Sequence, residues 1–147
     1  MTSSDTLVDG SGNPLAGDSQ VENVQSGQTG TSISRTVPAG TLAADGDFLE
    51  FTCWGDGVSS EGVSVSFGST SIFTLPSISG TDFVITGTIV RKGATSCASG
   101  VTGDDDGNTH ATATTSITET LANALTLTVS TDGTGAMRVL IVKKWSA

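Results

Sequence analysis

The stretch GVSVSFGSTSIFTL, residues 62–75, decides the fold. In its first half, valine and phenylalanine alternate with serine, a period of two that gives a β-strand one apolar and one polar face. A Gly-Ser pair then interrupts the alternation, and apolar residues resume until Pro76 ends the run. The stretch is therefore predicted to form two strands joined by a tight turn.

Short extended runs of this kind recur on both sides of the hairpin, separated by turn signals. In residues 47–54, for example, Leu49, Phe51 and Cys53 share one face of the predicted strand. Residues 94–108 lack any periodic apolar residue and are predicted as a long exposed loop. The sequence predicts about eight strands, near residues 32–37, 47–54, 62–67, 70–75, 82–91, 110–118, 123–130 and 136–145.

Length and composition fit a single all-β domain. The chain has 147 residues, 19 of them glycine, and is rich in serine and threonine, so strands and tight turns are favoured over helices. Eight antiparallel strands in a chain of this size predict two packed sheets, of which the jelly roll is the common form. We expect an eight-stranded jelly-roll-like sandwich over residues 31–147, preceded by an extended N-terminal arm over residues 1–30.

The N-terminal segment differs from the rest of the chain, since residues 1–30 contain no Lys, Arg or aromatic residue. A disordered tail is one interpretation of this composition. The other is an arm that binds a neighbouring subunit or a partner protein. In that case its apolar residues supply the contacts, and the candidates are Leu7, Val8, Val21 and Val24.

The last predicted strand, residues 136–145, is apolar on both faces. Met137, Val139 and Ile141 alternate with a second apolar set, whereas a strand at the surface of a monomer has one apolar face. Either this strand is covered on both sides within one chain, or its second face meets another subunit. The predicted oligomer interface consists of Leu140, Val142 and Trp145.

The formal charge of −9, with only six Lys and Arg, argues against nucleic acid and anionic membranes as partners. No apolar run reaches the length of a membrane-spanning helix, and the N-terminus lacks the features of a secretory signal. Synthesis and assembly in a cytoplasm are therefore expected. That compartment favours reduced thiols at Cys53 and Cys97, while a disulfide between them is also compatible with the sequence.

Residues for catalysis or metal binding are sparse. The chain has one histidine, His110, and no G-x-S-x-G turn that would expose a nucleophilic serine. The acidic run at residues 104–106 has oxygen ligands suited to calcium but lacks the alternating spacing of a calcium loop, which favours a solvated loop. Trp54 and Trp145 fit a core or an interface better than a sugar platform. We expect no enzymatic activity, no metal and no cofactor.

A succession of short motifs resembles one group of viral proteins. Residues 35–47 read RTVPAGTLAADGD, followed by FLEFTCWGDG, then VSVSFGSTSIF and FVITGTIVRKGATS. This order is similar to that of small jelly-roll virion proteins of tailed bacteriophages, which occur as capsid decoration (cement) proteins, head fibres and tail-fibre domains. The likeness covers about residues 31–145. In addition, the N-terminal TLVDGSGNPLAG resembles segments that join virion proteins to their attachment points.

The resemblance implies a homotrimer on the surface of a bacteriophage capsid, assembled in the cytoplasm of the host bacterium. It further implies that residues 1–30 bind the major capsid protein or another virion protein. As a capsid decoration protein, the chain would stabilise the shell across capsomer boundaries. The alternative function is a receptor- or glycan-binding tip of a head or tail fibre, which would use Trp54 or residues 94–108.

Overall fold

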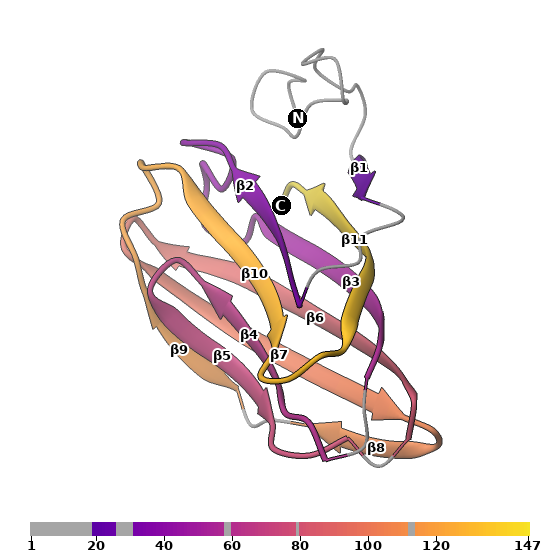
Figure 1. The fold of residues 1–147 in the computed structure, drawn as a ribbon. Coiled ribbons are helices and arrows are strands. Elements are labelled where there is room, and N and C mark those ends of the chain that lie inside the picture. Colours follow the sequence, from indigo (N-terminus) through magenta and orange to yellow (C-terminus); the bar gives the residue numbers. More distant parts are fainter. Residues whose placement is uncertain (1–18, 26–30, 58–59, 79, 112–113) are drawn as a thin grey trace.

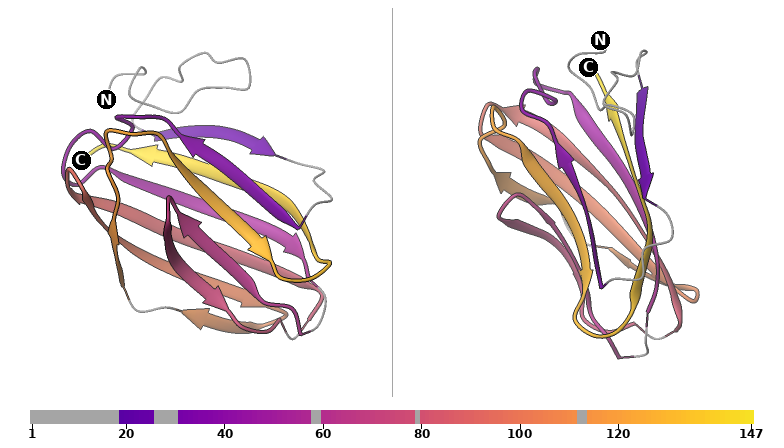
Figure 2. Two further views of the ribbon diagram at one scale, coloured as in Figure 1. Left: turned by 60° about the vertical axis from the view of Figure 1, so that its left-hand side comes forward. Right: turned by 45° about the horizontal axis from the view of Figure 1, so that its top comes forward.

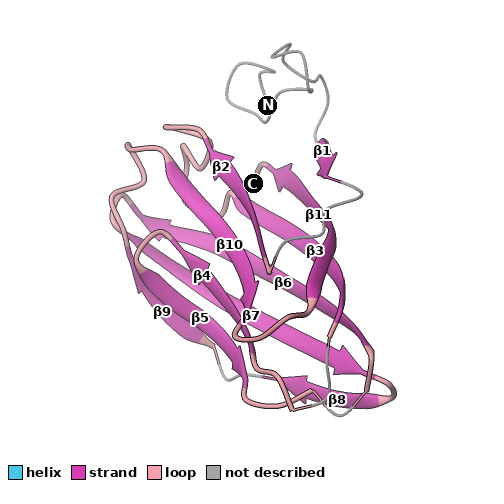
Figure 3. Cartoon of the chain, in the orientation of Figure 1, coloured by secondary structure: helices cyan, strands magenta, loops and turns pink. Residues whose placement is uncertain are grey.

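Two antiparallel β-sheets pack face to face in the computed structural model (Figure 1). The structure describes residues 19–25, 31–57, 60–78, 80–111 and 114–147. Within them, Figure 3 shows strands and loops only, and no helix is long and apolar enough to cross a membrane. The strands are β1 (Ser19–Gln25), β2 (Ser32–Val37), β3 (Phe48–Asp56), β4 (Val63–Phe67), β5 (Thr70–Leu75), β6 (Asp82–Gly93), β7 (Ser96–Asp105), β8 (Asn108–Ala111), β9 (Thr115–Thr118), β10 (Leu125–Thr131) and β11 (Ala136–Trp145).

The larger sheet has seven strands in the order β1-β11-β3-β6-β7-β8, and β9 pairs with β7 beside β8. The smaller sheet has four strands in the order β2-β10-β4-β5. In both sheets, strands from the beginning and the end of the chain are neighbours, since β10 lies beside β2 and β11 beside β3. The predicted all-β sandwich is confirmed, but the described residues form eleven strands rather than eight. Strands β1 and β7 were not predicted as strands, and the predicted strand 110–118 is divided into β8 and β9. This strand order does not by itself identify a jelly roll, which stays a prediction.

Strand β1 lies at the edge of the larger sheet, where it pairs antiparallel with β11 (Figure 2). The sequence places these residues in an arm that precedes the domain. By its backbone pairing, the segment 19–25 is instead the outermost strand of the sheet. It thereby leaves β11 with a partner on each side.

The core fills the space between the two sheets. Its side chains come from the apolar residues that alternate with polar ones along the strands. In β4 the valines and phenylalanine are buried while the serines are partly exposed, as the sequence predicts. Buried side chains of β3, β6 and β11 meet them from the opposite sheet, among them Leu49, Ile85 and Leu140, which have no exposed surface. At about 25 cal/mol for each Å² removed from water, this burial is the main stabilising contribution.

Residues 94–108, expected as an exposed loop, instead contain the whole of the ten-residue strand β7. Every second side chain of β7 is buried, but the buried positions are occupied by small or polar residues such as Cys97, Ser99 and Gly103. The ring of Phe73 lies where a side chain of Gly103 would be, because a Cβ there would be 2.8 Å from its Cζ atom. The opposite sheet therefore fills the core space that the small side chains of β7 leave empty.

A β-bulge between Met137 and Val139 changes the phase of β11. The inward residues are Met137, Leu140 and Val142, so the two apolar faces that simple alternation predicts are redistributed. Arg138 at the bulge forms an ion pair with Asp56 of β3. Arg138 is the extra residue of the bulge, because a bulge places two residues of one strand opposite one residue of its neighbour.

Candidate functional site

The outer face of the seven-stranded sheet carries a shallow depression of about 340 Å³, here called the outer trough. It lies across β11, β3, β6 and β7, and the side chains of its floor and walls include Glu50, Thr52, Thr86, Thr88, Thr102 and Lys143. Polar and charged groups thus gather at the middle of a sheet whose other face is the apolar core.

Strand register brings these residues together in two neighbouring rows. In one row, Thr52 lies opposite Ile141 on one side and Thr86 on the other, and Thr86 in turn lies opposite Thr102. Directly paired residues of neighbouring strands have Cβ atoms about 5 Å apart. The row is therefore a line of three threonines across three strands.

The second row places opposite charges side by side. Glu50 of β3 lies opposite Lys143 of β11, and on its other side opposite Thr88 of β6. The row ends at Gly100 of β7, where an added Cβ would have no atom within 4 Å. The trough is thus open above β7, and it holds a carboxylate, an ammonium group and hydroxyls within one row.

Two tryptophans lie beyond the two ends of the outer trough. Trp145 stacks on Phe48 with ring centroids 6.1 Å apart and an interplanar angle of 14°, and its Nε1 donates a hydrogen bond of 2.7 Å to Glu50 Oε2. At the other end, Trp54 follows Thr52 on the same face of β3 and is 41% exposed. It is the one exposed large hydrophobic side chain in the described part of the chain.

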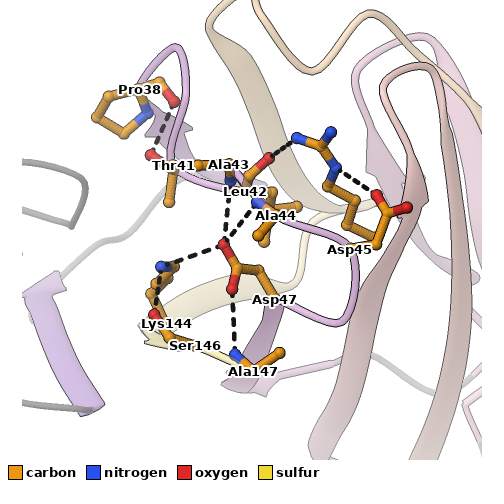
Figure 4. A network of polar contacts seen from close by, with 11 residues as sticks. Pro38, Thr41, Leu42, Ala43, Ala44, Asp45, Asp47, Lys144, Ser146 and Ala147 are labelled. Atoms are coloured by element: carbon orange, nitrogen blue, oxygen red, sulfur yellow. Dashed lines mark hydrogen bonds and ion pairs between the residues drawn. The ribbon is translucent and has the colours of Figure 1, made fainter. Parts of the chain in front are cut away.

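A buried polar cluster around Asp47 and Lys144 fixes the end of β11 (Figure 4). Asp47 Oδ2 accepts hydrogen bonds from the amides of Ala43 and Ala44, and Oδ1 accepts one from the amide of Ala147. Lys144 Nζ lies 3.4 Å from Asp47 Oδ2. Burial raises the pKa of Asp47, but the amide donors and the charge of Lys144 outweigh it and hold that pKa below its usual value.

The residues predicted to form an oligomer interface separate in the structure. Leu140 and Val142 are core residues of a single chain, with exposures of 0% and 1%, because the bulge turns them inward. They are therefore not available to a second copy of the folded chain. The outward apolar residues of β11 are Val139, Ile141 and the partly exposed Trp145.

The predicted arm residues lie largely beyond what is described. Leu7 and Val8 are outside the described residues. Val21 and Val24 belong to β1, where the backbone of Val21 pairs with that of Lys143, but their side chains are outside the described part. The contacts of these four side chains stay predictions.

The acidic run and the single histidine occupy the hairpin of β7 and β8. Asp105 is buried, and its Oδ1 lies 3.0 Å from His110 Nε2. Asp104 accepts a hydrogen bond from Thr109, and Asp106 accepts one from the amide of Thr81. The three carboxylates thus point to different partners, and the described residues include no group of three His, Cys, Asp or Glu suited to holding a metal ion.

The two cysteines are free and buried in different strands of the larger sheet. Cys53 lies in β3 as expected, whereas Cys97 lies in β7 rather than in a loop. Burial raises the pKa of Cys53 to about 12. Burial also raises the pKa of Cys97 to about 11, against the opposing effect of the positive charge of Arg91.

Sequence reasoning identified Trp54, Trp145 and Glu50 as members of strands, but it missed the contribution of β7 to the outer trough. The sequence offers no alternation that marks this strand, because residues 96–105 (SCASGVTGDD) are small or polar on both faces. In comparisons with known proteins, no protein-family model matches the sequence, and no curated protein matches it.

Proposed function

We propose that the protein is a structural component of a tailed-bacteriophage virion, a jelly-roll-like homotrimer that decorates the capsid surface without enzymatic activity. The proposal starts from the resemblance of the motifs between residues 35 and 96 to those of small virion proteins. In this role each copy stabilises a boundary between capsomers, and many copies act together on the shell.

The observation that carries the proposal is the position of β1. Residues 19–25, which follow the segment 6–17 that resembles virion attachment segments, lie as a strand at the edge of the larger sheet. An edge strand offers backbone N–H and C=O groups for pairing with a strand of another chain, a recurrent mode of peptide recognition. This edge therefore supplies an attachment surface toward the major capsid protein or another virion protein.

Contacts between copies in the trimer are proposed at the outward face of β11. Val139 and Ile141 are neighbours there, both partly exposed, and Val139 lies opposite the exposed Trp54. An interface of this mixed kind is consistent with non-obligate association, because such interfaces are about as apolar as the rest of a protein surface. The charge of −9 keeps free copies soluble and apart until other contacts form.

The mass of the full chain in solution, measured by light scattering during size-exclusion chromatography, tests the trimer. We expect a trimer for the native chain and a monomer for Val139→Asp. The matched control is Thr126→Asp, an exposed residue on the outer face of the smaller sheet, which should stay trimeric. A native chain that is monomeric at every concentration contradicts the trimer.

The capsid role is tested on particles. Phage particles are stripped of the protein with mild denaturant and heated with and without the protein added back. Restored binding with a raised temperature of shell rupture supports a cement function. Stripped and restored particles that rupture at the same temperature contradict it.

A further inference from the structure

We infer that the outer trough is a binding site for a short neutral oligosaccharide, which lies across it between Trp54 and Trp145. This inference rests on the side chains of one face of a single chain. That face includes Ile141, which is also proposed above for contacts between copies, so an oligosaccharide and a second copy would compete for it. The inference concerns the same face of β3, β6, β7 and β11 that carries the depression of about 340 Å³.

The dimensions of the face suit an extended ligand. Phe48, which carries the stacked Trp145 ring, and Trp54 lie six residues apart on the outward side of β3. At 3.2–3.4 Å for each residue, the two aromatic groups are roughly 20 Å apart along the strand. The depression lies between them, so a short linear oligosaccharide can contact both ends and the floor together.

The chemistry of the face matches the two kinds of surface on a sugar. A pyranose ring has an apolar face of C–H groups, which packs on an aromatic ring, and a rim of hydroxyl groups that donate and accept hydrogen bonds. Trp54, 41% exposed, offers an aromatic face to solvent. Between the aromatic ends, the two rows of the trough present a carboxylate acceptor, an ammonium donor and threonine hydroxyls.

Glu50 is held in position before any ligand arrives. Its Oε2 accepts the 2.7 Å hydrogen bond from Trp145 Nε1, while Trp145 is itself fixed by stacking on Phe48. Because one oxygen of the carboxylate is oriented in this way, less side-chain entropy is lost when the carboxylate binds a sugar hydroxyl. Trp145 therefore acts partly as a positioning residue for Glu50.

Charge favours a neutral ligand over an acidic one. The trough contains one acidic and one basic residue, Glu50 and Lys143, which lie opposite each other in the strand register. The chain as a whole carries a charge of −9, so a polyanionic glycan is repelled on approach. A neutral glycan has no such cost.

Intrinsic fluorescence gives a direct measurement, because the two tryptophans of the chain are the two that flank the trough. The full-length protein is titrated with maltohexaose, cellohexaose, mannohexaose and chitohexaose, and with a hyaluronan oligosaccharide as the acidic control. We expect saturable changes in emission with at least one neutral hexasaccharide and none with hyaluronan.

Three variants separate this site from nonspecific effects. Trp54→Ala is expected to weaken binding about tenfold, the loss expected when one packed aromatic ring is removed. Thr88→Val removes a hydroxyl of the floor at nearly constant shape and should weaken binding several-fold. The matched control Thr128→Val lies on the outer face of the smaller sheet and should bind as the native chain does.

Calorimetry with the same hexasaccharides checks the result for Trp54→Ala independently of fluorescence, and circular dichroism confirms that each variant is folded. If none of the four neutral hexasaccharides binds, or if Thr128→Val weakens binding as much as Thr88→Val, the inference is wrong. Absence of binding in a chain that is nevertheless trimeric would contradict this inference and leave the proposed capsid function intact.

Discussion

Lys144 and Asp47 form an ion pair inside the sandwich, with Nζ 3.4 Å from Oδ2 and with side-chain exposures of 2% and 5%. The pair joins the last strand to the loop that precedes β3. Lys144 Nζ also donates a hydrogen bond of 2.8 Å to Ser146 Oγ, and Asp47 accepts amide hydrogen bonds from both segments. The ammonium group of Lys144, which occupies a core position, thus has both an ion pair and a hydrogen bond.

Replacing Asp47 by Ala should reduce the free energy of unfolding by about 3 kcal/mol, because the substitution leaves a buried ammonium group without its carboxylate. The matched control is Asp45→Ala in the same loop. Asp45 is 66% exposed and pairs with Arg91, so its removal should cost less than about 1 kcal/mol. Urea unfolding of both variants measures the difference, and equal losses would contradict the special role of the buried pair.

Acid should destabilise the native chain in part through Asp47. Its pKa is lower in the folded protein than the ordinary value of 3.8, so the folded state binds this proton less readily than the unfolded state. The resulting stability is present at neutral pH and is lost as the pH falls below about 3.8 toward the folded-state pKa. We expect Asp47→Asn to lose less stability than the native chain between neutral pH and pH ~3.

This comparison uses urea midpoints at each pH, with Asp45→Asn as the control that keeps the native acid response. Parallel pH profiles for the native chain and Asp47→Asn would show that other carboxylates account for acid sensitivity.

Of two glycines on neighbouring strands, only one should be sensitive to an added methyl group. At Gly87 of β6 a Cβ would overlap the ring of the buried Phe51, so Gly87→Ala should cost about 1–3 kcal/mol. At Gly100 of β7 the space is open, and Gly100→Ala should leave stability unchanged. Thermal unfolding of the two variants provides the measurement, and a destabilised Gly100→Ala would mean that the floor of the trough is more crowded than described.

Both thiols should be unreactive in the folded protein. Burial raises the pKa of Cys53 to about 12 and that of Cys97 to about 11, so little thiolate forms near neutral pH. A colorimetric thiol reagent should detect almost no thiol in the native chain and both thiols in denaturant. Rapid labelling of either cysteine under native conditions would show that the larger sheet opens locally.

The strands were predictable where apolar residues alternate with polar ones. The last strand, 136–145, has the predicted bounds, and β4 and β5 form the predicted hairpin. Strand pairing was not predictable, because each strand carries the pattern of its own faces but not the identity of its neighbour. The adjacency of β2 to β10 arises only when the whole core is assembled.

Two local features account for the main differences between the predicted and the observed strands. In β7, burial selects for small size rather than hydrophobicity, since Phe73 fills the space beside Gly103. In β11, one bulge residue reverses the phase of everything after it, which turns Leu140 inward and Ile141 outward. Arg138 occupies the bulge, between the paired residues Met137 and Val139.

The candidate site was predictable only in its parts. Trp54 and Glu50 were placed correctly within one predicted strand, and Trp145 at the end of another. Their assembly into one trough needs the neighbouring β6 and β7, and the second of these had been assigned to a loop. Register between four strands creates the site, so no single stretch of sequence contains it.

The strand order has a consequence for how the protein is made. A nascent chain that has left the ribosome only as far as residue 124 holds β2 and β4 without β10, the strand that lies between them. The larger sheet likewise stays incomplete until β11 has emerged to join β1 with β3. Contacts between residues this distant in sequence form slowly. The sandwich can therefore close only after β11 has been synthesised.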